Sequence, residues 1–227
     1  MDCWICGAIA TTGEHKTKQS DLRLVLGKPS QGQPFYFHDK DVRNRPIGSY
    51  KGEFLKSSTR LCARCNNQLT QPYDFAWERM SEWLRTRRPT IKAGDIIRGN
   101  RIFPMNTASE MRGVHLFFTK LTGCHLIEAG FRFDQAALAT SLLTGNTNPY
   151  IYLKFGVSRS GQLVGSTDLH ASIRPSDDSL AFAVWGYSLN NLVIHVMYAI
   201  AGESREGLLD AWRARSGSNR LVLADFP

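Results

Sequence analysis

The clearest pattern of apolar and polar positions lies between residues 70 and 90 and predicts an α-helix. Apolar side chains recur there at the i, i+3, i+4 and i+7 spacing of one helix face: Tyr73, Ala76, Trp77, Met80 and Leu84. A proline at position 72 suits the first turn of this helix, and a proline at position 89 ends it. The other face carries arginines at positions 79, 85, 87 and 88, so we expect one core face and one basic edge.

Shorter patterns precede this helix along the chain. Residues 8–12 predict a short strand, and residues 54–61 predict a second strand that leads into Cys62. Residues 21–26 are apolar at helical spacing, begin after Ser20 as a helix cap and end at a glycine, so they predict one short helix. Residues 28–50 are rich in Gly, Pro, Gln and Asp, and we expect a loop there that includes at most one strand.

The pattern changes after residues 89–104, which hold two prolines and two glycines and predict a linker. Residues 105–121 predict a helix, and Asp134 is placed to cap a second helix over 135–143. Strand-like runs follow, separated by short turns that favour an antiparallel meander: residues 150–157, 163–173, 180–189 and 192–200. A closing helix over 205–213 and a last strand over 221–226 are expected after them. We therefore predict an α+β fold with two domains, residues 1–98 and residues 99–227, the second built on an antiparallel sheet.

Basic residues concentrate in the first hundred positions. The 227-residue chain has a formal net charge of +8, and residues 1–100 hold 17 Lys and Arg against 10 Asp and Glu, whereas residues 101–227 hold 11 against 10. A polyanion is the natural partner of such a region, because each neutralised phosphate releases condensed counterions. Nucleic acid, DNA above all, is therefore the expected partner, although solubility alone would explain the charge equally well.

The composition argues against a membrane protein. No apolar run approaches the roughly 20 residues that a bilayer crossing requires. The first residues lack the basic and then apolar layout of a signal peptide. We expect a cytoplasmic protein without membrane contact, in which disulfides do not form.

Four of the five cysteines form two Cys-x-x-Cys pairs, Cys3 with Cys6 and Cys62 with Cys65. Four thiolates are the ligand set that a structural, tetrahedral Zn²⁺ prefers. A redox dithiol is the alternative, but matched pairs without a thioredoxin-like βαβ pattern disfavour it. A closed four-cysteine site leaves no coordination position for substrate, so any chemistry must lie beside the zinc.

The residues around these pairs resemble the HNH, or ββα-metal, nucleases, in particular their recombination endonuclease VII branch. The pattern of that branch is a Cys-x-x-Cys pair, an acidic residue followed by His, and a second Cys-x-x-Cys pair followed by Asn. This chain has Glu14 and His15 between its cysteine pairs and Asn66 directly after the second. The resemblance covers about the first 90 residues, and it implies a zinc-stapled HNH-like domain at 1–98.

The resemblance also implies a mechanism for DNA hydrolysis. Glu14 and Asn66 would hold a catalytic Mg²⁺ or Mn²⁺ through oxygen atoms, and His15 would act as the general base for water. The sequence departs from the family in three ways. Glu14 replaces the usual Asp, Asn66 stands where other branches have His, and the insertion between the two halves is long. A third residue normally orients the base, and His38 and Asn44 are the weak candidates for it.

Two functions therefore stay open at this point. One is a metal-dependent endonuclease in a phage or bacterial defence setting. The other is a non-catalytic, zinc-stapled module that binds nucleic acid or protein. Residues 99–227 show no catalytic motif and are expected to recognise substrate, to form a homodimer or to bind a partner protein. Cysteine and histidine residues outside the motif are expected in the core or on the surface without catalytic roles: Cys124, His115, His170 and His195.

Overall fold

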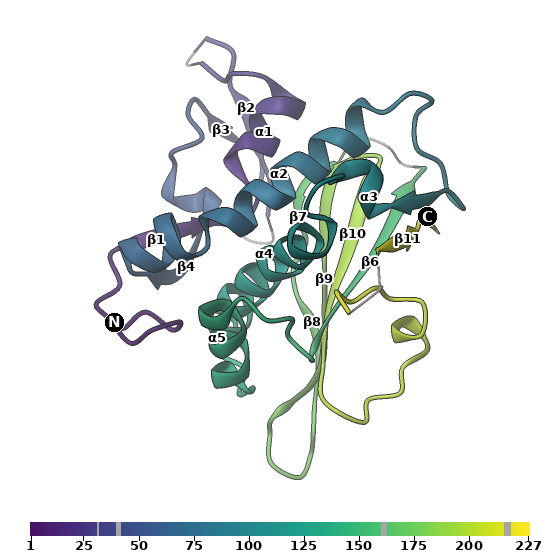
Figure 1. Ribbon diagram of the computed structural model, residues 1–227. Helices are drawn as coiled ribbons and strands as arrows, with labels where there is room; N and C mark the ends of the chain where they lie inside the picture. Colours follow the sequence, from purple (N-terminus) through teal and green to yellow (C-terminus); the bar gives the residue numbers. More distant parts are fainter. Residues whose placement is uncertain (31, 40–41, 160–162, 216–218) are drawn as a thin grey trace.

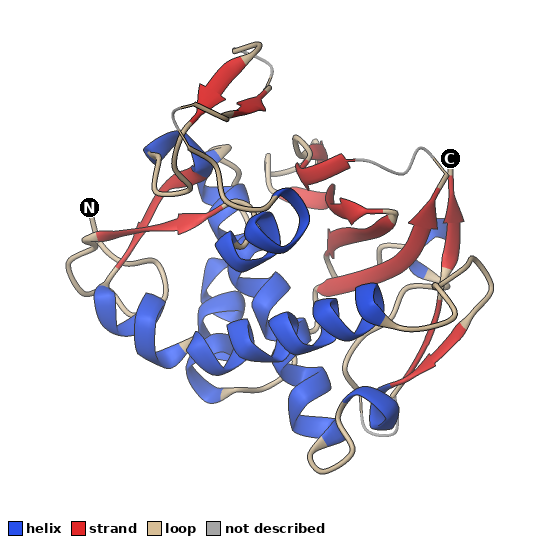
Figure 2. Ribbon diagram, turned by 90° about the horizontal axis from the view of Figure 1, so that it is seen from above, coloured by secondary structure: helices blue, strands red, loops and turns tan. Residues whose placement is uncertain are grey.

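The fold places a layer of helices between one large sheet and a group of short N-terminal strands. The protein is represented by a computed structural model that describes residues 1–30, 32–39, 42–159, 163–215 and 219–227. Two helices dominate the middle layer, α2 (Gln71–Thr86) and α4 (Thr107–Glu128). Seen from above, they separate the large sheet from the strands near the N-terminus (Figure 2). Within the described part of the chain, none of the helices combines the length and apolarity that a membrane crossing demands.

The large sheet is mainly antiparallel, as the sequence predicts. Its strands are β6 (Ile151–Ser158), β7 (Leu163–Ser166), β8 (His170–Ile173), β9 (Leu180–Asn190), β10 (Leu192–Ala199) and β12 (Ala224–Phe226). β10 lies between β9 and β6 and is antiparallel to both, while β12 adds a parallel edge strand beside β6. Asn190 adopts a positive φ of 58° in the tight turn from β9 to β10, a backbone conformation that Asn tolerates better than most residues.

Helix α4 is the centre of the core and is buried on nearly all sides. Its Phe117 stacks on Trp77 of α2 with ring centroids 5.6 Å apart. Its Phe118 meets Trp185 and Tyr187 of β9, with centroid separations of 6.3 and 5.6 Å. Each such aromatic pair contributes about 0.5–1.5 kcal/mol beyond its buried area. The aromatic cluster therefore joins α2, α4 and the large sheet into one core.

The N-terminal region is a two-stranded antiparallel sheet with a long excursion between its strands. β1 (Thr12–His15) pairs with β4 (Lys56–Leu61), and the register is irregular between Gly13 and His15. The excursion contains α1 (Gln19–Leu26), β2 (Phe35–Phe37), β3 (Arg45–Ile47) and a short 3₁₀ turn η1 (Glu53–Leu55). β2 and β3 form a hairpin that projects away from the helices in both views (Figures 1 and 2).

Most of the predicted elements are confirmed, some with shifted ends. The helix over residues 70–90 is α2, the strand over 54–61 is β4, and the helix over 21–26 is α1. The first strand begins at Thr12 and not at residue 8. Asp134 caps α5 (Gln135–Thr144) as predicted, because its carboxylate accepts a 2.9 Å hydrogen bond from the Ala137 N–H.

Three predictions along the chain were wrong. Residues 28–50 contain the β2–β3 hairpin and not a loop with at most one strand. The expected linker includes β5 (Ile96–Arg98) and α3 (Gly99–Ile102), and β5 pairs with β11 (Arg220–Val222) near the other end of the chain. In place of the closing helix there is only the turn η3 (Glu206–Leu208). Trp212 and Leu153 exchange two backbone hydrogen bonds of 2.7 and 2.9 Å. Because this bridge uses the N–H and carbonyl groups of Trp212, the segment around Trp212 is extended and not helical.

The apolar core continues across the predicted domain boundary at residues 98 and 99. Leu61 and Trp77 belong to the same buried cluster as Leu116 and Ile194. A small separate cluster around Tyr50 supports the excursion between β1 and β4. The division into domains 1–98 and 99–227 stays a prediction.

Candidate metal centre

The four paired cysteines come together at the end of the N-terminal sheet. Their sulfur atoms all lie within 4.8 Å of one another, and the Cys6 and Cys62 sulfurs are 3.6 Å apart. Tetrahedral zinc with bonds of about 2.3 Å would place its sulfurs about 3.8 Å apart, so little contraction is needed. This cluster can hold a metal ion such as zinc. The fold is thus confirmed as α+β with antiparallel sheets and a four-cysteine cluster near the N-terminus.

Two backbone turns position the sulfur atoms. The first folds back on itself, since Cys3 N–H donates to the Ala8 carbonyl at 2.7 Å and Gly7 N–H donates to the Cys3 carbonyl at 2.8 Å. Gly7 has a φ of 76°, a conformation that favours glycine. The second turn joins β4 to the π-helical turn η2 (Cys65–Leu69) that precedes α2. Local hydrogen bonds therefore help to position the sulfur atoms of each pair.

Hydrogen bonding and burial set the thiol acidities in opposite directions. The Cys65 N–H lies 3.3 Å from the Cys62 sulfur and lowers the pKa of Cys62 to about 7. Burial raises the pKa of Cys65. A bound cation would favour the thiolate form of all four residues and would release their protons. Metal binding should therefore weaken as pH falls.

Glu14, the predicted ligand of a catalytic cation, already faces a buried ammonium. Its carboxylate lies 3.2 Å from Nζ of Lys120, a residue of α4 with no exposed surface. The same Nζ lies 2.8 Å from the carboxylate of Asp74 on α2, and Asp74 also lies 3.2 Å from Nζ of Lys18. Burial opposes the charge of Lys120, but Glu14 and Asp74 outweigh burial and raise its pKa. Lys120 is therefore a fixed positive charge between two carboxylates.

His15, the predicted general base, is oriented by a backbone carbonyl. Its Nε2 lies 3.0 Å from the Tyr50 carbonyl oxygen, so Nε2 donates this hydrogen bond, and Nδ1 is the acceptor nitrogen of the neutral ring. Tyr50 is itself anchored, because its hydroxyl donates to the Leu22 and Gly27 carbonyls at 3.2 and 3.0 Å. Among the residues that the structure describes, Nδ1 of His15 has no hydrogen-bond partner.

The two residues predicted as weak candidates for orienting His15 form no hydrogen bond with it in the described part of the chain. His38 and Asn44 lie in the exposed loop between β2 and β3, and the Asn44 N–H donates to His38 Nδ1 at 3.3 Å. The orienting group is the carbonyl of Tyr50 instead. Every residue type carries a carbonyl, so nothing in the sequence indicates which one will face an imidazole.

Asn66, the second predicted cation ligand, lies at the other end of β1. It follows Cys65 in η2, and its side-chain amide donates to the Thr12 hydroxyl at 3.1 Å. β1 therefore holds Glu14 and His15 near one end and contacts Asn66 of η2 through Thr12 at the other, and each of the three side chains has a different partner. The roles of His15, Glu14 and Asn66 in catalysis stay predictions.

A catalytic Mg²⁺ or Mn²⁺ does not fit the site as it stands. Such ions take oxygen ligands and keep several waters, so they need an open and hydrated carboxylate. The Glu14 side chain is only 9% exposed, and the Lys120 ammonium already supplies the positive charge beside it. Lys120 and Asp74 are the residues that sequence reasoning missed. Lys120 lies in a long apolar helix, and only its oddity as a charge among apolar residues could have pointed to it.

Comparison with known proteins identifies no relative of this chain. No protein family, no curated protein and no solved structure matches this chain. The function is therefore inferred from the geometry of the site.

Proposed function

We propose that this chain is a zinc-stapled ββα module that binds nucleic acid and does not cut it. The buried contact between Glu14 and Lys120 carries this proposal, because it removes the carboxylate that a hydrolytic cation would require. The order β1, β4, α2, with one cysteine pair before β1 and the other before α2, supports an HNH-like architecture. Structural zinc at the four cysteines would hold β1, β4 and α2 together. The ammonium of Lys120 takes the place of the catalytic cation beside Glu14.

The contact surface for nucleic acid is placed on the excursion between β1 and β4. Five of its exposed cations have no carboxylate within ion-pair distance among the described residues: Arg23, Lys28, Arg43, Arg45 and Lys51. Arg45 also lies over the ring of Phe54, at 4.4 Å, and Tyr36 is 62% exposed on the same hairpin. Unpaired cations with an exposed aromatic ring suit a phosphate backbone with an unstacked base beside it.

Salt-dependent binding tests this proposal. Each phosphate contact changes the slope of log affinity against log salt by about 0.9 for duplex DNA. The triple variant Arg43→Gln, Arg45→Gln, Lys51→Gln should therefore lower the slope by up to about 3 and weaken binding at low salt. A charge-matched control removes three exposed arginines outside the excursion, Arg132, Arg174 and Arg205. Equal binding by the two triple variants would contradict the proposed surface.

A second candidate function, hydrolysis of DNA, is favoured by one specific observation. His15 has one ring nitrogen fixed on a carbonyl and the other left as an acceptor, which is the state that a general base requires. Hydrolysis with a metal would require Glu14 to leave Lys120. A charged Lys120 would then keep only Asp74 as its partner in the core, which is unfavourable.

A plasmid-nicking assay separates the two candidates. We expect no nicking by the zinc-loaded protein with Mg²⁺ or Mn²⁺, and unchanged DNA binding by His15→Ala. Nicking that His15→Ala abolishes would establish the endonuclease instead. Nicking that His15→Ala leaves unchanged would contradict the non-catalytic proposal and would assign the activity to a site other than His15.

A further inference from the structure

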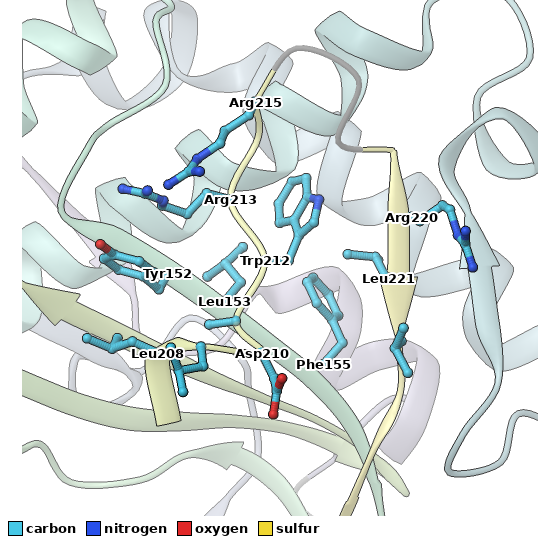
Figure 3. Close-up of a pocket in the computed structure, with 13 residues that line it drawn as sticks. Tyr152, Leu153, Phe155, Leu208, Asp210, Trp212, Arg213, Arg215, Arg220 and Leu221 are labelled. Carbon is cyan, nitrogen blue, oxygen red and sulfur yellow. The ribbon is translucent and has the colours of Figure 1, made fainter. Parts of the chain in front are cut away.

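A cavity of about 350 Å³ lies at the edge of the large sheet, far along the chain from the cysteine cluster. Its floor is apolar and aromatic and comes from β6, β11 and the segment between η3 and β11. The floor residues are Tyr152, Phe155, Leu208, Trp212 and Leu221 (Figure 3). Pockets for small ligands begin at about 300 Å³, so this one suits a small ligand and not a long chain.

Two arginines lie on the same side of this cavity, and neither has a carboxylate partner in the described part of the chain. Arg213 and Arg215 both extend toward the Tyr152 side, whereas the guanidinium of Arg220 points away from Trp212 (Figure 3). The acidic residue of the lining, Asp210, has an 83% exposed side chain and lies 4.0 Å from Lys154. The cavity therefore presents two arginine charges without internal compensation.

Two contacts hold the side chain of Arg213 in place. One of its terminal nitrogens donates to the Pro149 carbonyl at 2.7 Å, and its guanidinium lies 4.4 Å from the centre of the Tyr152 ring. An arginine fixed in this way loses little freedom when it binds an anion, and its planar group matches phosphate oxygens. Its remaining N–H groups have no hydrogen-bond partner within the described part of the chain and can donate to that anion.

Positive charge accumulates further around the rim. Arg220 of β11 is paired directly with Arg98 of β5 across the antiparallel ladder. Like charges that face each other in a sheet repel. Both side chains are exposed, and no ion pair involving either is seen within the described residues. These two arginines add positive charge beside the cavity, although Arg98 does not line it and Arg220 points away from it.

We propose that this cavity binds the phosphate monoester of a nucleotide. The phosphate would lie on Arg213 and Arg215, and the sugar or base would cover the apolar floor beside Tyr152. A phosphate monoester carries close to two negative charges at neutral pH, which matches the two arginines better than a single carboxylate does. The ligand can be a free mononucleotide or the phosphorylated end of a nucleic acid strand, since both present the same group.

Calorimetric titration of the full-length, zinc-loaded protein tests this site. The probes are AMP, adenosine, and a short single-stranded oligonucleotide with either a 5′-phosphate or a 5′-hydroxyl. We expect the phosphorylated member of at least one pair to bind about tenfold to a hundredfold more tightly than its unphosphorylated counterpart. A preference in the AMP pair identifies the free nucleotide as the ligand, and a preference in the oligonucleotide pair alone identifies the strand end. No preference in either pair would overturn the proposal.

Variants assign the binding to the cavity. Arg213→Gln with Arg215→Gln should abolish the preference for phosphate, while Arg132→Gln should keep it. Arg132 is a suitable control because it also bonds a backbone carbonyl, that of Asp177, and does not line the cavity. A preference that survives the double variant would contradict the site. These variants leave the excursion between β1 and β4 unchanged. Loss of the phosphate preference in them therefore does not bear on the proposed binding of duplex DNA.

Discussion

Helix α4 adds buried ion pairs to its apolar contacts with the N-terminal region, whereas its contacts with the large sheet are mainly aromatic. On the N-terminal side, α4 offers charges: Lys120 lies between Glu14 and Asp74, and Glu128 lies 3.1 Å from Lys16. On the sheet side, α4 offers aromatic rings, with Phe118 against Trp185 and Tyr187. Metal–thiolate bonds are lost to chelators, whereas the packing of Phe, Trp and Tyr rings is not. The two regions should therefore respond differently to the same treatments.

Loss of the metal should have the largest effect. In Cys65→Ser the cluster loses one of four ligands, and structural zinc sites of this kind contribute about 10 kcal/mol or more. Hydrogen exchange should show that β1, β4 and the two cysteine turns lose protection, while β6, β9 and β10 keep it. Cys124→Ala, a change at the buried cysteine outside the cluster, is the control. Protection that persists in β1 and β4 of Cys65→Ser would mean that zinc does not hold this region.

Removal of the buried cation should have the next largest effect. Lys120→Met leaves Glu14 and Asp74 without their shared partner inside the protein, and such losses cost about 3–5 kcal/mol. Urea unfolding measures this change in the free energy of unfolding. The added substitution Glu14→Gln should recover part of the loss, because it removes one unpaired charge. If Lys120→Met is as stable as the unsubstituted chain, the ion pair does not anchor the N-terminal region.

Acid should weaken the sheet side of α4 through His125, a half-buried histidine. Burial lowers the pKa of His125 to about 4, from an ordinary value of 6.5, and its ring stacks on Trp185 at 4.6 Å. The unfolded chain therefore binds the proton first as pH falls. Stability is fully present above pH 6.5 and is lost progressively toward pH 4, by up to about 3 kcal/mol from this group.

The variant His125→Phe isolates that contribution. A phenyl ring can keep the stack on Trp185, and no hydrogen bond is lost at Nε2, which has no partner in the described structure. The difference in unfolding free energy between pH 7 and pH 4.5 should shrink by about 2–3 kcal/mol relative to the unsubstituted chain. An unchanged difference would show that His125 is not neutral in the folded state.

Substitution of Gly123, where α4 lies close to the first cysteine turn, should have the smallest effect. A methyl group added at Gly123 of α4 would lie 2.4 Å from the ring of Trp4, which belongs to the first cysteine turn. Gly123→Ala should therefore destabilise the protein by about 1–3 kcal/mol by overpacking, although alanine is the better helix former. Thermal unfolding measures the loss, and Trp4→Leu should reduce it in the double variant. A more stable Gly123→Ala would show that Trp4 moves freely.

Local patterns predicted the local parts of the fold well. The apolar spacing from Tyr73 to Leu84 indicated α2, and the two cysteine pairs indicated the four-cysteine cluster, because both signals depend on neighbouring residues. The pairing of β5 with β11 joins Ile97 to Leu221. No local pattern at either position indicates a partner that distant in the sequence.

The surroundings of the site were predicted less well for the same reason. Glu14 was expected at a hydrated cation, but it faces Lys120, a residue 106 positions later whose charge is paired only in the folded chain. The four-cysteine cluster was visible because the cysteines that bind one metal ion come in fixed spacings. The buried ion pair has no such spacing, so the sequence could not indicate it.

Metal content measured on the purified protein tests the central claim most directly. We expect one zinc per chain that Cys65→Ser removes, and no Mn²⁺ bound at micromolar concentration when manganese is titrated and followed by electron paramagnetic resonance. A second ion that binds tightly to the unsubstituted chain and is lost in Glu14→Gln would show that Lys120 does not take the place of a cation.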